Sequence, residues 1–487
     1  MRRDEPNQDK GERTVFMKMK LVYLLLTSAL SSILLASCAT YKKPFEGVSK
    51  SSYTTLKPQE KTSLPKGIHT LTLEEAQNIA LNNNPSFKTK YFAIAAARAR
   101  YYQSFSSYYP TLSVSATIGQ SFSRIYAPSN YTRTRSQAEN YGVELGGSWL
   151  IFDSLVREMN MLSARHSWKA SVAEEDDARR LLLRAVAYAY NDVQLAAAQQ
   201  RIAIADMNYS ADLLKDTQLK FEAGAVPLSD VLNFKIRYNN GESDLISAQY
   251  TYAYNKYALA ALLGLTDGTI PDEVKFPEMP SPEGDVLPDI SVYLDTALAN
   301  RPDLRAYREN LEAAKFSFWS SLCAFGPTVS VDYSLGYSRN RTLNRYLDTG
   351  SGTKSYHSTG SFNYGASASW NLFEGGNTYF NARAAQAAMA QAEYNLAEIW
   401  ITVITDVRAA YDNYITYLKQ VKLFQKTYEL TKQTRDLVEE EYKAGNAELT
   451  RLNEAQTDLV NAEMNLVSSV VKMNQAKAQL EAAINVR

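Results

Sequence analysis

An internal duplication constrains this sequence more than any other feature. Pro110 and Pro327 lie in the similar segments Tyr-Pro-Thr-Leu-Ser-Val and Gly-Pro-Thr-Val-Ser-Val, 217 positions apart. Trp149 and Trp370 each begin a Trp-X-X-Phe segment, and these two lie 221 positions apart. A nearly constant offset over most of a chain indicates a repeat, and a repeat defines the architecture before any single residue does. The chain is therefore expected to contain two copies of one structural unit.

Each copy contains two segments in which apolar residues alternate with small or polar ones. These segments are residues 112–119 and 142–151 in the first copy, and 329–337 and 362–372 in the second. Alternation places the two sets of side chains on opposite faces of a sheet. An apolar exterior with a small, polar interior is what a transmembrane barrel strand requires, although a soluble sandwich with one wet face has the same period.

The number of strands favours a barrel made by several chains. Known membrane barrels begin at about eight strands, and an open sheet edge cannot face lipid. Four strands must therefore be completed by other copies of the chain. The polar segments 123–140 and 339–360 are predicted to be exposed loops, since they are rich in Ser, Thr, Asn and Arg.

Uninterrupted helices are predicted after each strand pair. Residues 153–223 contain no glycine or proline over 71 positions, and residues 377–444 contain none over 68. At about 1.5 Å per residue, each helix can extend about 100 Å. Each run ends at Ala-Gly (Ala223-Gly224 and Ala444-Gly445), which suits a left-handed helix C-cap. Return helices are expected over residues 228–263 and 449–483.

The last helix carries a heptad pattern of alternating large and small positions. The large positions are Leu452, Leu459, Leu466, Met473 and Leu480, and the small ones are Ala455, Ala462, Ser469, Ala476 and Ala483. In the first copy the counterpart is Val231, Tyr238, Leu245, Tyr252 and Leu259. Sustained heptads of this kind predict left-handed coiled-coil hairpins, one in each copy.

The domain organisation follows from these elements. The first repeat is expected over residues 71–265, with its β-hairpin at about 109–152, and the second over 290–487, with its hairpin at about 327–374. Single shorter helices, 73–108 and 290–323, are predicted to lead into the hairpins. Residues 266–289 have no period and join the repeats.

The N-terminus resembles a lipoprotein signal. Lys18 and Lys20 precede the apolar run 21–35, which ends in Leu-Ala-Ser-Cys at Cys38. This ending resembles a lipobox, so residues 1–37 are expected to be a signal peptide, Cys38 a lipidated residue, and 38–70 a linker. The polar residues 1–16 are interpreted as an upstream mis-start. A plain secretory signal with a chance cysteine is the alternative.

Composition excludes several functions. Lys+Arg and Asp+Glu are equal at 52 each, so there is no basic face for nucleic acid. Cys323 is the one cysteine besides Cys38, which excludes an intrachain disulfide framework if Cys38 is lipidated. No nucleotide-binding loop, metal-ligand spacing or nucleophile–base set is present, so no catalytic residues, metal or cofactor are expected.

In this order the features resemble the TolC family of outer-membrane efflux factors, specifically its OprM-like lipoprotein branch. The segments that carry the resemblance are Leu73–Ala76 (LEEA), Tyr108–Pro110 (YYP), Asn300–Leu304 (NRPDL), Trp370–Gly376 (WNLFEGG), Tyr442–Gly445 (YKAG) and Leu452–Gln456 (LNEAQ). The first copy departs at residues 150–155, which lack the double glycine of Gly375-Gly376.

The resemblance implies a mixed fold, a coiled-coil barrel in the periplasm below a transmembrane β-barrel. It implies a homotrimer, in which three chains with four strands each complete a 12-stranded barrel in outer-membrane lipid. The helices then form a periplasmic tunnel, whose closed tip binds a periplasmic adaptor coupled to an inner-membrane pump. From the sequence alone, a dimer or a tetramer is equally permitted.

The candidate gate lies just after each Ala-Gly turn, where three residues at i, i+3 and i+7 share one helix face. They are Asp230, Asn233 and Arg237 in the first copy and Arg451, Glu454 and Asp458 in the second. We hypothesise that Asp230–Arg451 and Arg237–Asp458 pairs, within and between protomers, hold the tip closed. The alternative is solvated charges beside a heptad seam, since exposed pairs contribute only about 0–1 kcal/mol.

Family resemblance implies acidic residues at the places of Arg451 and Glu454, with an acidic partner where Asp230 lies. Arg451 departs from that pattern, which changes the net charge of the ring. The resemblance also implies that the turns Ala223-Gly224 and Ala444-Gly445 dock the adaptor, because small residues permit close approach of a partner helix.

The expected function is therefore the exit duct of a tripartite efflux system in the outer membrane. Two alternatives stay open. One is the outer-membrane duct of a type I protein secretion system. The other is a coiled-coil structural lipoprotein without a pore.

Overall fold

The computed structural model describes residue 64 and residues 69–127, 132–277 and 288–485. The chain divides into two units, residues 1–61 and residues 62–487, and every described residue belongs to the second. The expected signal peptide and the lipidation residue Cys38 lie outside the described residues.

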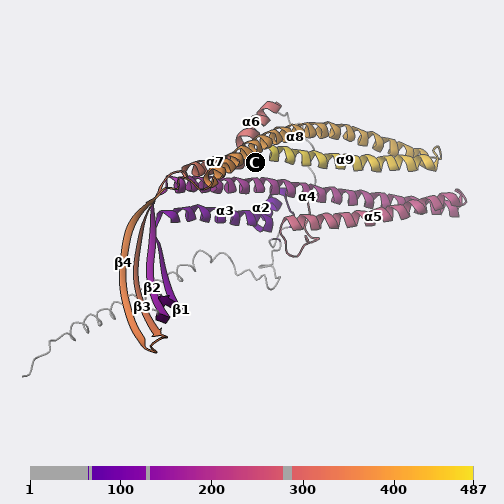
Figure 1. Cartoon of the computed structure of the whole chain (residues 1–487). Helices are drawn as coiled ribbons and strands as arrows, with labels where there is room; N and C mark the ends of the chain where they lie inside the picture. Colours follow the sequence, from indigo (N-terminus) through magenta and orange to yellow (C-terminus); the bar gives the residue numbers. More distant parts are fainter. Residues whose placement is uncertain (1–63, 65–68, 128–131, 278–287, 486–487) are drawn as a thin grey trace, which may run out of the picture. The chain divides into compact units, whose positions relative to one another are not determined.

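Four antiparallel strands form one sheet in the order β1-β2-β3-β4. The first copy supplies β1 (Thr111–Ala127) and β2 (Thr132–Phe152), and the second supplies β3 (Thr328–Tyr346) and β4 (Gly352–Ser369). Figure 1 shows the four strands side by side as one curved ribbon. The prediction of four strands per chain is confirmed.

The strands are longer than the sequence pattern predicts. Most of residues 123–140 and 339–360 lie in strands, so the prediction of loops there is wrong. The backbone ladder continues because its hydrogen bonds do not depend on side-chain polarity. The apolar–polar alternation fades, by contrast, where both faces of the sheet are polar. At the other end, β4 stops at Ser369, before the end of the alternating segment 362–372.

The duplication extends to the register of the sheet. Thr111 pairs with Ser148 in the first hairpin, and Thr328 pairs with Ser369 in the second, at the same offsets of 217 and 221. β2 and β3 join the two copies through a continuous ladder with one bulge, between Leu150 and Phe152. In the described chain, β1 and β4 each have a single neighbouring strand, so the sheet has two open edges.

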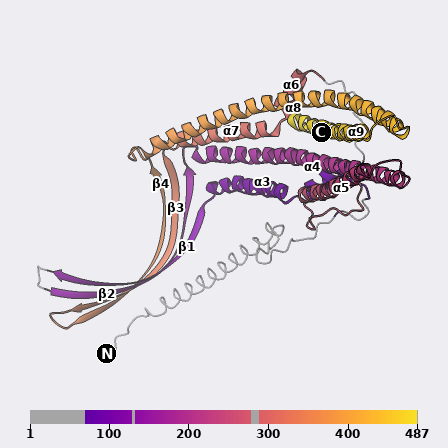
Figure 2. The same ribbon diagram turned by 90° about the vertical axis from the view of Figure 1, so that its right-hand side faces the viewer.

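Two long helices of equal length follow the hairpins. α4 (Val156–Glu222) and α8 (Asn377–Lys443) each contain 67 residues. The return helices are α5 (Leu228–Leu262) and α9 (Leu449–Ile484). α5 packs on α4, α8 packs on α9, and α4 contacts α9, so the side-by-side order is α5, α4, α9, α8. Figure 2 shows the two helical hairpins from a second side.

The heptad seam predicted on α9 is buried. Nine of its ten positions are buried, and Leu466 packs partly buried against the same core as Met473 and Leu480. On α5, Leu259 is buried in the core around Tyr190 of α4, where the Tyr190 hydroxyl donates to the carbonyl of Leu71. None of the helices in the described part of the chain is both long and apolar enough to cross a bilayer.

Each shorter helix is divided by a proline, although the sequence pattern predicts one helix in each copy. α2 (Leu73–Asn83) ends before Pro85, where α3 (Pro85–Ser104) begins; the 3-10 turn η1 (Phe105–Tyr108) follows α3. α6 (Ile290–Asn300) ends before Pro302, where α7 (Pro302–Cys323) begins. Proline disfavours the helical conformation of the preceding residue and suits the first position of a new helix.

The residues at these two breaks differ in charge. In the first copy, the Asn84 side chain accepts a hydrogen bond from the Phe87 N–H and donates to the Leu262 carbonyl. In the second copy the equivalent Arg301 is buried and pairs with Asp303 at 2.5 Å and Asp406 at 3.2 Å.

The strand-to-helix junction of the first copy is held by an arginine. Arg157 of α4 donates to the carbonyls of Leu150 (2.6 Å), Ile151 (2.7 Å) and Ser107 (3.1 Å). Its backbone N–H also donates to the buried carboxylate of Asp153. Two residues between them, Ser154 and Leu155, have positive φ of 59° and 75°.

The junction of the second copy uses glycines in the same backbone conformation. Gly375 and Gly376 have φ of 62° and 87°. Glu374 is exposed and accepts hydrogen bonds from Asn371 and Thr378. The double glycine that the first copy lacks is therefore replaced by two side-chain-bearing residues in left-handed geometry.

One feature is the same at both junctions. The Trp149 indole N–H donates to the Tyr108 carbonyl at 3.0 Å, and the Trp370 indole N–H donates to the Phe325 carbonyl at 2.8 Å. Each bond ties the end of a hairpin to the segment just before its first strand.

Candidate pore and helix tip

One face of the sheet carries small and polar side chains, and we call it the small-residue face. Its rows are set by the register, for example Ser113–Gly146–Ser334–Asn363 and Ser115–Glu144–Gly336–Ser361. From Thr111 to Ser123 of β1 and across the paired positions of the other strands, its ionisable residues are Glu144, Asp332 and His357. Such a face suits contact with water.

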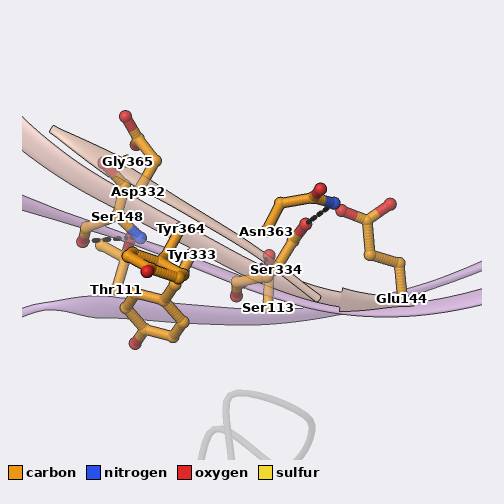
Figure 3. A pocket seen from close by; sticks show the side chains of 12 residues that line it. Thr111, Ser113, Glu144, Ser148, Asp332, Tyr333, Ser334, Asn363, Tyr364 and Gly365 are labelled. Atoms are coloured by element: carbon orange, nitrogen blue, oxygen red, sulfur yellow. Dashed lines mark hydrogen bonds between the residues drawn. The ribbon is translucent and has the colours of Figure 1, made fainter. Parts of the chain in front are cut away.

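Figure 3 shows the carboxylates of Glu144 and Asp332 extending to the same side of the sheet. Neighbouring strands are also bridged by side chains, since the Asn363 amide donates to the Ser334 hydroxyl at 3.3 Å. The Ser148 N–H donates to the Thr111 hydroxyl at 3.4 Å (Figure 3). The small-residue face thus combines small hydrogen-bonding groups with the carboxyl groups of Glu144 and Asp332.

The opposite face is apolar near the helices, and we call it the apolar face. Rows such as Val114–Leu145–Leu335–Phe362 lie there, and all four of these side chains are at least partly exposed in the single chain. From Trp149 to Tyr141, β2 rises about 27 Å. With a strand tilt of about 40°, this length corresponds to a height of about 20 Å along the axis of a barrel. That height is close to the apolar band of about 25 Å on outer-membrane barrels.

The Ala-Gly turns end both long helices with the same geometry. Gly224 and Gly445 have φ of 73° and 79°. The Ala225 N–H bonds to the Lys220 carbonyl, and the Asn446 N–H bonds to the Glu441 carbonyl, at 2.9 and 2.8 Å. These are the bonds of a Schellman C-cap, which requires a left-handed residue and therefore favours glycine.

Arg237 lies in a polar cluster that joins three helices near the tip. Its guanidinium donates to the backbone and side-chain oxygens of Asn453 on α9, at 3.2 Å each, and contacts Asp206 of α4 at 3.4 Å. Gln456 of α9 also donates to Asp206, at 2.9 Å. Asp206 is not among the residues predicted from the sequence. Asn453 and Gln456 lie in the LNEAQ segment, from which only the neighbouring Glu454 is predicted to belong to the gate.

The predicted pairs Asp230–Arg451 and Arg237–Asp458 are not formed within the described chain. Arg451 pairs instead with Glu441 at 3.4 Å, and both side chains are largely exposed. Asp230 accepts from the Ser229 hydroxyl. Glu454, Asp458 and Asn233 are exposed. The hypothesis also included pairs between neighbouring protomers, and that part stays a prediction.

The flanking helices α5 and α8 carry exposed apolar side chains. On α8, Leu423, Leu430 and Leu437 lie seven residues apart and are 65%, 64% and 62% exposed. On α5, the exposed residues include Leu232, Ile236, Ile246 and Tyr250. Heptad leucines on a helix surface are typical of a coiled-coil seam, so both flanks present surfaces suited to another helix.

Among the described residues, no group of three or more His, Cys, Asp or Glu side chains is placed to hold a metal ion.

Comparison with known proteins assigns the family. The model of the outer membrane efflux protein family matches residues 77–265 and 293–486. The chain belongs to this family. Its two matched segments correspond to the two copies of the duplication, so the TolC-like resemblance is confirmed. Proteins of this family are transport channels rather than enzymes.

Relatives include both efflux and secretion proteins. The chain is 24% identical over 420 residues to the alkaline protease secretion protein AprF of Pseudomonas aeruginosa, covering 84% of this chain and 81% of that protein. It is 21% identical to the outer membrane protein TolC of Vibrio cholerae, covering 85% of this chain and 92% of that protein.

The fold matches a solved channel. The Campylobacter jejuni outer membrane channel CmeC superimposes with a TM-score of 0.72 at 20% identity, covering 85% of both chains. As a member of the outer membrane efflux protein family, the protein is an outer-membrane channel protein that extends into the periplasm. Channels of this family are trimeric outer-membrane components of tripartite efflux or secretion systems.

Proposed function

We propose that three copies of this chain form the exit duct of a tripartite efflux system. The observation that carries this proposal is the pair of open sheet edges in a duplicated chain. β2 and β3 join the two copies within one chain. By the same geometry, β4 of one chain would join β1 of the next, and three chains would close 12 strands.

The duplication fixes the expected register between protomers. Ser148 of β2 pairs with Asp332 of β3. The second-copy equivalent of Ser148 is Ser369 of β4, at the offset of 221, and the first-copy equivalent of Asp332 is Ser115 of β1, at the offset of 217. Ser369 of one chain is therefore expected to pair with Ser115 of the next chain. The exposed leucine stripe of α8 would meet the apolar flank of α5 on that chain.

Cysteine cross-linking tests the closure. In a Cys323→Ser background, Ser369→Cys combined with Ser115→Cys should give covalent trimers under mild oxidation. Ser369→Cys combined with Thr111→Cys, four positions out of register, is the matched control and should not. Cross-linking at the control pair alone would overturn this register.

Bilayer conductance tests the duct itself. The reconstituted protein should pass ions in rare, brief openings, since the tip is proposed to be closed at rest. A protein that never conducts, even as a cross-linked trimer, would leave only the anchored coiled-coil alternative.

The tip is proposed to be the gate, held by Asp230, Asn233 and Arg237 against Arg451, Glu454 and Asp458 of a neighbouring protomer. The Arg237–Asp206–Gln456 cluster would hold the two helical hairpins of each protomer together beside this gate. Asp230→Ala combined with Arg451→Ala should raise the open probability, whereas the matched pair Asp244→Ala with Lys472→Ala should not. Unchanged closure in the first variant would remove these residues from the gate.

The turns at Ala223-Gly224 and Ala444-Gly445 are proposed to dock the adaptor. A Cβ added at Gly224 or Gly445 would meet nothing within 4 Å, so both turns are open to a partner. Gly445→Ala combined with Ala444→Leu should abolish export while trimers still form. Normal export in that variant would contradict docking at the turn.

Lipidation of Cys38 is part of the same proposal, because it would anchor the mature chain beside its barrel. Metabolic labelling with palmitate should mark the protein and be lost in Cys38→Ser.

A second candidate function is the duct of a type I secretion system, supported by the similarity to AprF. Deletion of the gene distinguishes the efflux function from the secretion function. Greater sensitivity to small toxic compounds with unchanged exported protein supports efflux, and the reverse supports secretion.

A further inference from the structure

The apolar face of the sheet changes character along the strands. Beyond Tyr141 and Tyr337, away from the helices, the same face carries cations rather than apolar residues. Six of them are arginines: Arg124, Arg133, Arg135, Arg339, Arg341 and Arg345. Lys354 of β4 is a seventh cation on this face. Among the described residues of this stretch, Glu139 is the one anion facing the same side.

Three of the arginines are direct neighbours. Arg124 of β1 pairs in register with Arg135 of β2, which pairs with Arg345 of β3. Adjacent strands lie about 4.8 Å apart, so three positive side chains stand in one row at that spacing. Like charges directly opposite one another destabilise a sheet, so a compensating anion would stabilise a row of three.

The described chain does not supply that anion. Glu139 is engaged by Arg341 at 3.3 Å. Asp348, in the turn after β3, accepts the backbone N–H of Arg133 at 2.6 Å. Neither Arg124, Arg135 nor Arg345 forms an ion pair with a described carboxylate, and all three are exposed. A compensating charge would therefore come from outside the described part of the chain.

Position along the strand identifies its source. The row lies on the face that contacts lipid nearer the helices, so it faces the surrounding membrane and not the pore. Arg135 is six residues beyond Tyr141, about 20 Å along the strand. With a tilt of about 40°, this is about 15 Å above the apolar band.

The headgroup layer of a phospholipid bilayer is only about 5–8 Å thick on each side. Phospholipid headgroups can therefore reach Arg339 and Arg341 but not the row of three. A lipid whose phosphates are carried on a taller saccharide headgroup can reach the whole series. Guanidinium groups also bind phosphate through paired hydrogen bonds, which suits such a ligand.

We propose that Arg124, Arg135 and Arg345 bind the phosphates of phosphorylated glycolipids in the outer leaflet around the barrel. The inference rests on the proposed barrel, since it needs the apolar face to be turned toward lipid. The bound glycolipid would neutralise the repulsion within the row and fix the barrel at one depth.

The test uses the full-length protein in nanodiscs of four compositions. These are phosphatidylcholine alone, phosphatidylcholine with phosphatidylglycerol, phosphatidylcholine with a rough-type lipopolysaccharide, and phosphatidylcholine with the same glycolipid after dephosphorylation. The apparent melting temperature should rise most with the phosphorylated glycolipid. A rise of equal size with phosphatidylglycerol or with the dephosphorylated glycolipid would overturn the proposal.

The variant Arg124→Gln/Arg135→Gln/Arg345→Gln removes both the repulsion within the row and the proposed phosphate site. In phosphatidylcholine alone it should melt above the wild type, because the repulsion is gone, and it should lose the glycolipid-dependent rise. A triple Arg→Lys variant should retain part of that rise. The charge-matched control Lys88→Gln/Lys169→Gln/Lys426→Gln, on exposed helix positions, should respond like the wild type.

An unchanged glycolipid response in the triple Gln variant would refute the site. So would an equal rise with a soluble polyanion, heparin, added to phosphatidylcholine nanodiscs. Conductance is measured in planar bilayers of the same four lipid compositions. A conducting triple variant without the glycolipid response supports both proposals, whereas loss of conductance in every sample counts against the duct and not against the arginine row.

Discussion

The two copies of the repeat make the same backbone turn between strand and long helix with different chemistry. In the first, Arg157 binds three carbonyls, and Ser154 and Leu155 adopt left-handed geometry. In the second, Gly375 and Gly376 take that geometry without strain, and no arginine is present. The first junction is thus held by side chains against its own backbone preference. The comparison shows that a duplicated architecture preserves conformation more strictly than the interactions that stabilise it.

The two junctions have different neighbours, and this explains part of the contrast between them. The Ser154 hydroxyl donates to the Pro327 carbonyl at 2.7 Å, so the first junction contacts the second copy within the same chain. Its counterpart Gly375 has no such partner in the described chain and would face Pro110 of a neighbouring protomer.

Removing Arg157 should break the first junction. The Arg157 guanidinium also contacts the Asp153 carboxylate at 3.4 Å. Arg157→Ala leaves three carbonyls and the buried Asp153 without their cation, and loss of one member of a buried charged set costs about 3–5 kcal/mol. The equivalent Thr378→Ala in the second copy should cost less than about 1 kcal/mol. Thermal unfolding followed by circular dichroism in detergent measures both, and equal losses would contradict the contrast.

The proline breaks should respond differently to pH. Burial opposes ionisation of Asp303, but the hydrogen bonds and charge of Arg301 outweigh it and hold the pKa of Asp303 below its ordinary value. A lowered carboxyl pKa contributes stability above the unfolded pKa of about 4 that is lost as the pH falls below it. Asp303→Asn should therefore cost about 3 kcal/mol at pH 7 and much less in acid.

The first copy offers the control for that measurement. Asn84→Ala removes a helix cap, for a loss of about 1 kcal/mol, and no titratable group is involved. Its effect on the melting temperature should be the same at pH 7 and at pH 3. If both variants show the same pH dependence, Asp303 is not its source.

Exchanging the residues at the left-handed positions should change the stability in opposite directions in the two copies. Gly376→Leu places a side chain at φ of 87° and should destabilise by about 1–2 kcal/mol. Leu155→Gly relieves the same conformation at an exposed position and should stabilise by up to about 1 kcal/mol. Melting temperatures of the two variants, measured side by side, should move in opposite directions.

The tryptophans should be equivalent, and their effect is the smallest of the series. Trp149→Phe and Trp370→Phe each remove one indole N–H bond to a carbonyl, worth about 1 kcal/mol. Equal shifts in melting temperature would show that this contact belongs to the shared architecture. A large difference would place it with the specialised contacts of one copy.

Sequence periodicity predicts the elements of this fold because both periods are regular over long segments. The α9 seam, the two long helices and the four strands follow directly. The strand ends could not be predicted, since past Tyr337 both faces of the sheet are polar and the period disappears. The pattern does not predict the proline breaks, because apolar spacing continues through Pro85 and Pro302.

The candidate site was harder to predict than the fold. Offsets align Asp230 with Arg451, but alignment of two positions does not make them touch. Arg237 instead reaches Asp206, which lies one helix away and has no charged counterpart in the second copy, where Thr427 stands. Contacts that cross between copies cannot be inferred from the repeat, since each copy has a different neighbour.

The equal length of α4 and α8 has a consequence for how such chains can evolve. Both helices begin at the sheet and end at an Ala-Gly turn, so their tips stop at one level. Inserting one heptad into α4 and its return helix alone would lower one tip by about 10 Å relative to the other. Changes in reach across the cell envelope must therefore occur in both halves of the gene together.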